Sequence, residues 1–548
     1  MKKSLVSLLL ALLLVLSSTC AFAIYDVPEA YDLPIGDGTE TLSIYMAMEK
    51  GSEKAMLTYD THTAVLEWAK RTGLNFTFVH PPENDDGSYF MTTIASMVLP
   101  DMWATGNWKT YYAGGVEGAI KDGILVDLNP MIEKYGYHYL TEAHKNWDAQ
   151  ATRNFMTDEG MYRFSAASQR VPVLGMQHTG MVVREDLLDK LGIDVPETID
   201  QVHDMLVAFK NDGIEIPLAL EKLTSSYYYD GDFLASWLGV TTNKFMIGED
   251  GKVTYSMLEP AYKDYLAMLK QWYSEGLIDV DCVSRVHADA KAMVTSGRSA
   301  MVAIGNWETQ ECIAVGKSAC GEDFNLIGLT APVKNEEAIG TKNHFARPIE
   351  NGGNGMYWGI STTCKIPEKA FKAFDWLYSY EGTELMVFGV NECVDQLHPE
   401  KNEIVQIHWT NDDGTRQFSD YILHNPELEY NSIRYVYTIQ NLSSEYASEM
   451  EYMQYGAECN AQCWEAWTAN ADSERHVPSN ISLTADESTK QVTTMNEIET
   501  FIYDKIYQIV FGEDTVDNWD GYVEQLHQMG IDDVIAIQQA ATDRYYAR

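Results

Sequence analysis

The pattern of hydrophobic and polar positions divides the first part of the chain into alternating strands and helices. Apolar residues run together over 41–48, recur at helical spacing over 60–70, and alternate over 74–79. This order predicts a β-α-β unit, in which two parallel strands are joined by a right-handed crossover. The same pattern then repeats, with predicted helices at 90–97 and 114–121 and predicted strands at 98–102 and 124–128. These alternations predict an open α/β lobe.

The stretch 170–213 predicts a passage from this lobe into a second one. An extended run over 171–183 precedes a short helix that begins at Glu185 and stops at Gly192. Thr198 opens the next helix, and Gln201 follows it at the spacing of a capping box, in which each side chain binds the other residue's backbone N–H.

The remaining pattern completes a second lobe and returns the chain to the first. Asp250-Gly251 predicts a hairpin turn, and Pro260 opens a helix that Gly276 ends. We expect 324–332 to carry the chain back. The other predicted elements are a strand at 298–304 and helices at 288–296, 367–380, 493–511, 519–529 and 531–546. Residues 391–480 show no clear period.

Composition and charge narrow the function classes. A chain of 548 residues exceeds what one hydrophobic core usually holds, so we expect two or more lobes. The formal net charge is −42, from 39 basic and 81 acidic residues. Such an excess repels phosphate backbones and anionic lipid headgroups, which argues against nucleic-acid and membrane-surface partners.

Residues 1–23 have the form of a secretory signal peptide. Two lysines precede an apolar segment, and Ala21-Phe22-Ala23 matches a cleavage site, so the mature chain is expected to begin at Ile24. Lipid attachment at Cys20 is the less favoured alternative, because Ser17 stands where lipoprotein signals usually have leucine. No later apolar run is long enough to cross a bilayer, and we expect a soluble, extracytoplasmic protein.

The chain lacks the common enzyme motifs. It has no G-x-S-x-G elbow, H-E-x-x-H pair, Walker loop or dinucleotide-binding glycine pattern. A glycosidase needs two carboxylates across a sugar, and 81 acidic residues make chance pairs abundant. Seven scattered cysteines remain after the signal peptide and predict neither a disulfide framework nor a zinc site. We expect no metal and no cofactor.

Candidate ligand contacts come from the rule that ligands bind in loops at the carboxyl ends of strands. Aromatic rings can stack on the apolar faces of sugars, while Asp, Asn and Glu bond to hydroxyls. For each tryptophan, packing in a core is an equally weighted alternative. The residues that we expect at the site are Glu49, Asp101, Trp103, Asn107, Tyr228, Asn306, Trp307 and Trp358.

Several segments, in order along the chain, resemble the extracellular solute-binding proteins of carbohydrate ABC transporters. The segments are REDLLDKLGIDVPETIDQVHDMLVAFK, SMVLPDM, GILVDL, EGLIDVD and SGRSAMVAIGNW. The last 38 residues are similar to the terminal helices of the large Gram-positive oligosaccharide-binding members of that family.

This resemblance implies a type II periplasmic-binding-protein fold, with two α/β lobes joined by crossing strands and an added helical C-terminal region. With the pattern above it suggests a signal peptide (1–23), a first part of the N-lobe (24–172), a first part of the C-lobe (173–325), a return to the N-lobe (326–390), and a mixed insert with C-terminal helices (391–548).

The implied function is that of a monomeric receptor. It would capture an oligosaccharide between closing lobes and deliver it to the membrane permease subunits of an ABC transporter. The alternatives are an extracellular glycosidase and a binding protein for a non-sugar solute such as a peptide.

Overall fold

The structure is a computed structural model, and part of the chain lies outside what it describes. The predicted signal peptide and Tyr228 are among the residues outside. The described residues are 24–49, 52–83, 85–147, 149–157, 160–161, 164–165, 179–221, 231–242, 245–342, 357–423, 425–428, 430–439, 458–471, 475–478 and 480–548.

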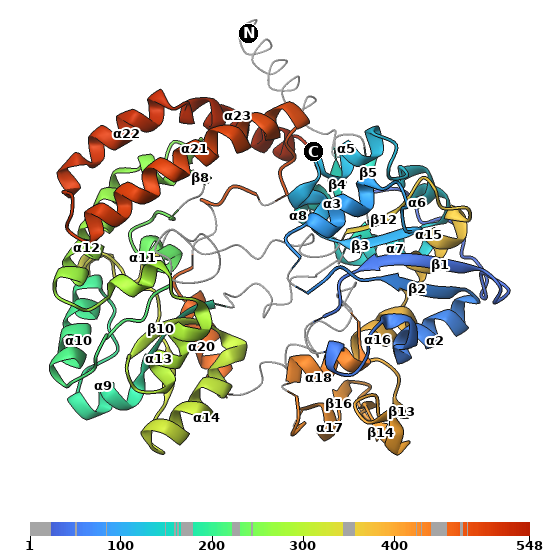
Figure 1. Cartoon of the computed structure of the whole chain (residues 1–548), viewed down its shortest axis with the longest axis horizontal. Coiled ribbons are helices and arrows are strands. Elements are labelled where there is room, and N and C mark those ends of the chain that lie inside the picture. Colours follow the sequence, from blue (N-terminus) through green and yellow to red (C-terminus); the bar gives the residue numbers. More distant parts are fainter. Residues whose placement is uncertain are drawn as a thin grey trace, which may run out of the picture.

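The first lobe is built on a five-stranded sheet in the order β2-β1-β3-β12-β6 (Figure 1). β1 pairs in parallel with both β2 and β3, whereas β12 runs antiparallel to β3 and β6. The helix between β1 and β2 completes the predicted β-α-β unit, which is therefore confirmed. The strands are β1 (Thr41–Met46), β2 (Asn75–Val79), β3 (Met102–Thr105), β6 (Phe164–Ser165) and β12 (Tyr357–Ile360).

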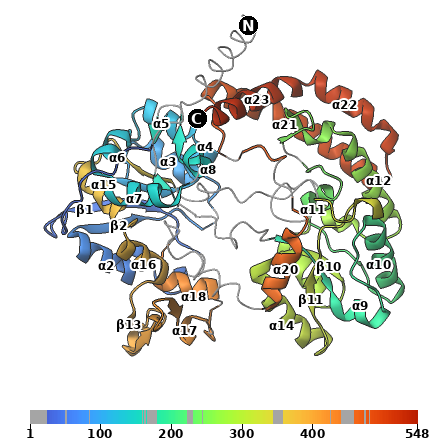
Figure 2. The same ribbon diagram turned by 180° about the vertical axis from the view of Figure 1, so that it is seen from behind.

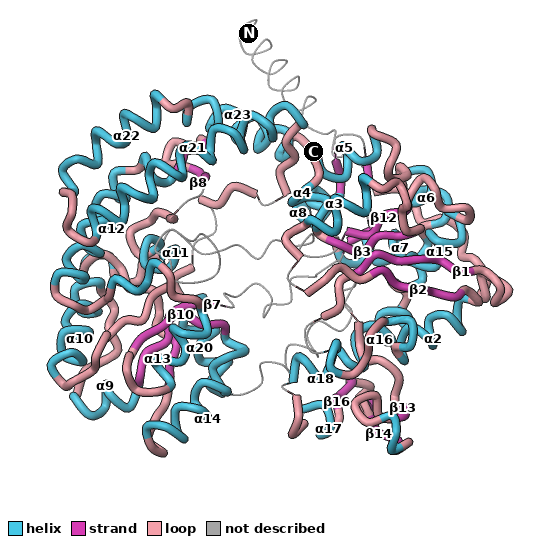
Figure 3. Tube along the Cα trace, viewed as in Figure 1, coloured by secondary structure: helices cyan, strands magenta, loops and turns pink. Residues whose placement is uncertain are grey.

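Alternate residues of these strands enter two different cores, one on each face of the sheet. Ile44 packs with α2, α15 and α16, whereas its neighbour Tyr45 packs with α3, α4 and α5. Figure 3 shows the strands enclosed by helices. The helices and short strands of this lobe are α2 (Thr63–Thr72), α3 (Ser88–Ala95), α4 (Asn107–Tyr111), α5 (Gly115–Lys121), α6 (Asn129–Tyr135), α7 (Tyr137–Asn146), α8 (Ala149–Phe155), β4 (Met156–Thr157), β5 (Gly160–Met161), α15 (Pro367–Trp376) and α16 (Tyr380–Phe388).

The second lobe is built on a smaller antiparallel sheet in the order β10-β7-β11. Both outer strands run antiparallel to β7. A separate hairpin, β8 with β9, forms around the predicted Asp250-Gly251 turn. The elements are β7 (Thr179–Arg184), α9 (Glu185–Leu191), α10 (Ile199–Asn211), α11 (Gly231–Ser236), β8 (Phe245–Ile247), β9 (Val253–Tyr255), α12 (Pro260–Ser274), α13 (His287–Thr295), β10 (Met301–Gly305), α14 (Thr309–Cys320) and β11 (Leu326–Gly328).

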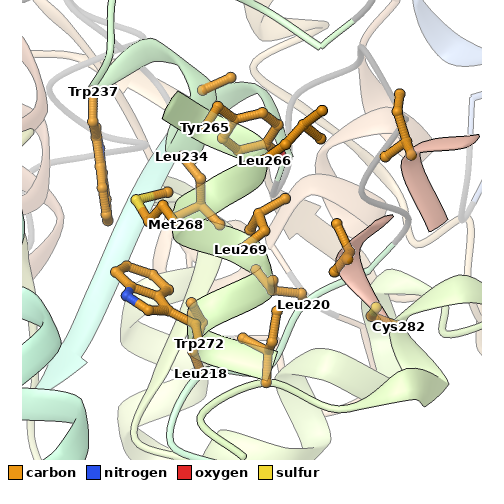
Figure 4. Close-up of a cluster of buried hydrophobic side chains, with 14 of the residues drawn as sticks. Leu218, Leu220, Leu234, Trp237, Tyr265, Leu266, Met268, Leu269, Trp272 and Cys282 are labelled. Carbon is orange, nitrogen blue, oxygen red and sulfur yellow. The ribbon is translucent and has the colours of Figure 1, made fainter. Parts of the chain in front are cut away.

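Helix α12 forms the centre of the second core. It begins at Pro260, which fits the first helical turn because that turn leaves its N–H groups without intrahelical acceptors. Its buried face points at side chains from the segments around it (Figure 4). The residues of this cluster that the figure labels are Leu218, Leu220, Leu234, Trp237, Tyr265, Leu266, Met268, Leu269, Trp272 and Cys282.

The second lobe extends further along the chain than the sequence predicted. We expected the return to the first lobe to begin at residue 326, but β11 pairs with β7 inside the second sheet. Val333 still bonds there, since its N–H donates to the carbonyl of Glu197 at 2.9 Å. The apolar run that we took for a crossing segment is a strand of the sheet.

Residues 391–439 and 458–548 pack on different lobes. The first group lies against the core of the first lobe through residues such as Ile407 and Val436, and the second group joins the cores of the second lobe. The elements are β13 (Glu392–Val394), β14 (Ile404–Gln406), β15 (His408–Thr410), β16 (Arg416–Phe418), α17 (Asp420–Leu423), α18 (Tyr430–Tyr437) and α20 (Glu458–Thr468).

Three C-terminal helices form an arch from the second lobe to the first (Figures 1 and 2). Helix α21 packs on α12, and α23 ends against α8, where the Tyr545 hydroxyl donates to Asn154 Oδ1 at 2.8 Å. The predicted terminal helices are thus confirmed, although α21 begins at Ala485, eight residues before the predicted start at 493. They are α21 (Ala485–Val510), α22 (Trp519–Gln528) and α23 (Ile531–Tyr546).

Short 3-10 helices complete the described elements. They are η1 (Ser52–Lys54), η2 (Tyr59–Thr61), η3 (Ser256–Leu258), η4 (Val280–Val283), η5 (Asn306–Glu308), η6 (Glu336–Ala338), η7 (Pro399–Lys401) and η8 (Val516–Asn518).

Candidate functional site

The strand ends next to the chain crossings define where a ligand could touch both lobes. In the first lobe, β1, β3 and β6 end at one edge of the sheet, and β12 starts there. The chain leaves this lobe after β6 and returns to it before β12. In the second lobe, Gly305 at the end of β10 pairs with Thr179, the first residue of β7 and the first described residue after the crossing. The two edges therefore lie on the sides of the lobes that the crossings connect.

Glu49 lies at this edge of the first lobe, in the loop after β1. Its backbone N–H donates to the Tyr59 hydroxyl at 2.7 Å, and the Ser52 hydroxyl donates to its carbonyl at 2.6 Å. Burial raises the pKa of Tyr59 to about 12, so the hydroxyl stays protonated and can hold the loop. The Glu49 side chain is partly exposed. The expected position of this residue at a strand end is confirmed.

Asn107 occupies the equivalent position after β3. It is the first residue of α4, and its N–H donates to the Thr105 hydroxyl at 3.2 Å. Asn107 is partly exposed and lies at the expected edge.

Asp101 lies at the opposite end of β3, which corrects its expected placement. It precedes the strand, and its carboxylate accepts hydrogen bonds from the Ser43 N–H and hydroxyl at 2.9 and 2.8 Å. We predicted the strand at 98–102, but it covers Met102–Thr105. Asp101 therefore ties the amino end of β3 to β1, away from the crossing edge.

Trp103 and Trp358 lie within strands, and their expected loop positions are wrong. Trp103 is fully buried among the aromatic rings that pack on α3, and its indole N–H donates to the Ser361 hydroxyl at 2.8 Å. Trp358 is 2% exposed and packs edge-on against Phe374 at a centroid distance of 4.1 Å. Both rings fill cores on the two faces of the sheet, the alternative that the sequence left open.

Asn306 and Trp307 lie where the sequence placed them, in η5 directly after β10. Trp307 is partly exposed. Asn306 is fully buried, and neither atom of its amide has a hydrogen-bond partner in the described part of the chain. Since a buried amide without partners is costly, this turn presents unused bonding capacity beside an aromatic ring.

Sequence reasoning missed Tyr435, which lies in α18 close to η1. Its ring is partly exposed, and the Arg434 guanidinium lies 4.3 Å from the centroid of this ring. The available signal was the spacing of apolar residues through Ile433 and Val436, within a region that otherwise showed no period.

Two cavities of the first lobe lie elsewhere. One of about 750 Å³ lies between α2, α16 and β13, and two of its acids pair with bases: Glu67 with Arg71 at 2.7 Å and Glu384 with Arg416 at 2.6 Å. The other, of about 650 Å³, lies between the N-terminal segment, α7 and the start of α16. Neither includes a residue of the candidate site.

The described ranges contain neither a cluster of metal-binding side chains nor a helix that could span a membrane. No group of three or more His, Cys, Asp or Glu side chains there is arranged to hold a metal ion. No helix among these residues is long and apolar enough to cross a membrane. All seven cysteines after the predicted signal peptide are free thiols.

Two α/β lobes with facing strand ends, linked by repeated crossings, define the class of two-lobe solute-binding receptors. The chain belongs to the bacterial extracellular solute-binding protein family, whose model matches residues 84–384, more than half of the chain. The resemblance seen in the sequence is confirmed.

Two relatives are carbohydrate-binding proteins by name. The fructooligosaccharide ABC transporter substrate-binding protein FusA of Streptococcus pneumoniae is 21% identical over 67% of this chain and 65% of its own length. The polygalacturonan/rhamnogalacturonan-binding protein YtcQ of Bacillus subtilis is 21% identical over 65% of this chain and 66% of its own. The chain thus matches slightly less than two thirds of the length of these curated relatives.

Solved structures establish the fold. The alginate-binding protein AlgQ2 superposes with a TM-score of 0.68 at 21% identity, covering 94% of this chain and all of that one. FusA in complex with kestose superposes with a TM-score of 0.69 at 17% identity, covering 93% of this chain and all of that one. The predicted two-lobe periplasmic-binding fold is confirmed.

Proposed function

We propose that this protein is a receptor that captures an oligosaccharide between its two lobes and delivers it to the permease subunits of an ABC transporter. The observation that carries the proposal is the η5 turn, where a partly exposed indole stands beside an amide without partners. The exposed part of an aromatic face suits the apolar face of a sugar ring. The names of FusA, YtcQ and AlgQ2 support a carbohydrate ligand.

On the first lobe we propose Glu49, Asn107 and Tyr435 as contacts. A sugar bound to both edges would make more contacts when the lobes are closed than when they are open. It would therefore shift the population toward the closed state, which is how binding would be signalled to a transporter.

A thermal-shift panel of neutral and acidic oligosaccharides, with peptides as the comparison set, tests the ligand class. We expect a sugar to raise the unfolding midpoint in proportion to the logarithm of its concentration, and to be recovered intact. A response to peptides alone would contradict a carbohydrate ligand, and turnover of the sugar would support the glycosidase alternative.

Replacing Trp307 tests the site. We expect Trp307→Ala to weaken binding of the sugar found in the panel by about tenfold or more, which corresponds to about 1.4 kcal/mol. The unfolding midpoint without sugar should change little because the ring is only partly buried. Trp409→Ala, which removes an exposed tryptophan of the first lobe, is the control. Unchanged affinity in Trp307→Ala would remove this ring from the site.

We also propose that the mature protein is exported and begins at Ile24, after ordinary signal-peptide cleavage. The mass of the exported protein distinguishes this end from a lipidated Cys20, which would retain Cys20 to Ala23 and gain acyl chains.

A further inference from the structure

Trp307 lies over the backbone of Gly305, at the end of β10. A Cβ atom added to Gly305 would stand 2.4 Å from indole atoms Cε2 and Cζ2 and 2.7 Å from Cη2. Side-chain carbons do not approach other atoms closer than 3.0 Å, so any other residue at 305 must displace the ring or the strand. The backbone at Gly305 is ordinary extended chain, with φ −81° and ψ 146°. Glycine is therefore required at this position because a larger residue would collide with the ring, and not because of its backbone conformation.

Glu308 fastens the turn that carries the indole. Its carboxylate accepts a hydrogen bond from the Gly305 N–H at 2.8 Å and lies 2.5 Å from Lys291 Nζ. His287 Nε2, also on α13, lies 3.1 Å from both carboxylate oxygens. Burial alone would raise the pKa of Glu308, but these hydrogen bonds outweigh it and lower the pKa to about 2. The carboxylate is charged at any physiological pH.

The network joins the two ends of the turn to a neighbouring helix. Glu308 closes η5 on Gly305, and Lys291 and His287 hold Glu308 against α13. The residues between these fixed points are Asn306, with its unpartnered buried amide, and Trp307. The charged network of Glu308, Lys291 and His287 holds both ends of this turn, and the Trp307 ring packs directly on Gly305. The turn therefore has few alternative conformations.

We propose that Gly305 and Glu308 are positioning residues that hold the Trp307 indole and the Asn306 amide in one orientation before ligand arrives. This inference rests on the proposed function for the identity of the ligand. The matching ligand is a sugar ring that offers an apolar face to the indole, which is the partly exposed group of the turn. Neither positioning residue need touch the sugar, because each acts through the orientation of the turn.

The test combines a spectroscopic signal from Trp307 with sugar affinity. The full chain is labelled with 5-fluorotryptophan, and Trp307→Phe assigns the Trp307 resonance in the fluorine NMR spectrum without sugar. We expect Gly305→Ala and Glu308→Ala to move this resonance and to weaken sugar binding about tenfold. Glu308→Gln should restore most of both properties, because its amide oxygen can still accept from the Gly305 N–H.

Gly521→Ala is the matched control. Gly521 lies in α22, where an added Cβ meets nothing within 4 Å, so this change should leave both the resonance and the affinity as they are. Circular dichroism and the unfolding midpoint of each variant establish that it is folded.

The outcomes separate this inference from the proposed function. A Trp307 resonance that stays in place in folded Gly305→Ala and Glu308→Ala overturns the positioning roles, whatever the protein binds. A resonance that moves while sugar affinity is unchanged overturns the link from orientation to binding. If the unaltered protein binds no sugar in the panel, the proposed function fails, while the sugar-free spectra still decide whether the two residues position the ring.

Discussion

Asp375 is a fully buried carboxyl group in α15 that holds three parts of the first lobe together. It accepts hydrogen bonds from the Tyr31 hydroxyl at 2.9 Å and from the backbone N–H groups of His138 and Tyr139 at 3.1 and 2.9 Å. Burial raises its pKa to about 7 even though these hydrogen bonds oppose the shift. Between about pH 4 and pH 7 the folded protein therefore holds a proton that the unfolded chain has released.

This titration predicts a pH-dependent stability. Because the folded pKa is raised, the contribution of Asp375 to stability falls as pH rises through that window, by about 1.4 kcal/mol for each unit of pKa difference. Asp375→Asn cannot titrate, so the stability of the variant relative to the unaltered protein should rise between pH 4.5 and pH 7.5. Urea unfolding of both proteins at several pH values measures the difference. A difference that is constant with pH would show that Asp375 titrates alike in both states.

At the same scale, the sequence predicted some site residues and misplaced others for identifiable reasons. Asn306 and Trp307 were placed correctly because an apolar run ends clearly at Gly305. Trp103 was misplaced because the strand begins four residues later than the apolar run at 98–102 suggested, and Val98 is in fact 79% exposed. A tryptophan in a sequence gives no sign of whether its ring faces a core or a ligand. That depends on which face of the sheet each strand position occupies.

At the scale of elements, the capping box at the start of α10 is the clearest case in which local sequence determines local structure. The Gln201 N–H donates to the Thr198 hydroxyl at 3.3 Å, and the Gln201 side chain accepts from the Thr198 N–H at 3.2 Å. The cap also holds a tertiary contact, since the Ile199 N–H donates to the Val333 carbonyl at 3.0 Å. The start of α10 is thus joined to Val333, in the last part of the second lobe.

Removing the cap should destabilise the protein. We expect Thr198→Ala to lower the free energy of unfolding by about 1 kcal/mol, because a helix N–H loses its acceptor. Thr493→Ala, at an exposed position inside α21, is the control and should have little effect or be slightly stabilising, since alanine favours helix. Chemical denaturation measures both. Equal effects of the two changes would show that the cap contributes nothing beyond helix propensity.

Elements without such local signals could not be predicted. Residues 391–439 form short strand pairs and short helices whose apolar residues complete the core of the first lobe, and strands of three residues are too short to show a period. β11 has the same length and was taken for a crossing. Long helices such as α21 and α23 were predicted because their apolar positions repeat over many turns.

At the scale of the whole molecule, the C-terminal helices belong to the second lobe and end on the first. Val534 of α23 lies in the second core, and the Val253 N–H donates to Gln539 Oε1 at 2.7 Å. At the other end of the helix, Tyr545 is 1% exposed and bonds to Asn154 of α8. This contact joins the lobes without passing through the candidate site.

The contact between α8 and α23 should contribute measurably to stability. We expect Tyr545→Phe to lower the free energy of unfolding by about 1–2 kcal/mol, because the buried Asn154 oxygen loses a hydrogen-bond donor. Tyr546→Phe, at the next and 57% exposed residue, is the control and should stay within about 0.5 kcal/mol of the unaltered protein. Thermal or urea unfolding measures both, and equal results would show that the hydroxyl is dispensable.

The arch has a consequence for building optical sensors from this protein. A fluorescent domain fused after Arg548 would start where the two lobes meet, since this residue donates to the Arg153 carbonyl of α8. It would report poorly on their separation and could hinder their movement. The exposed turns at Asp412–Gly414 and Gly321–Asp323 lie on different lobes, and reporters inserted there would follow the distance between them.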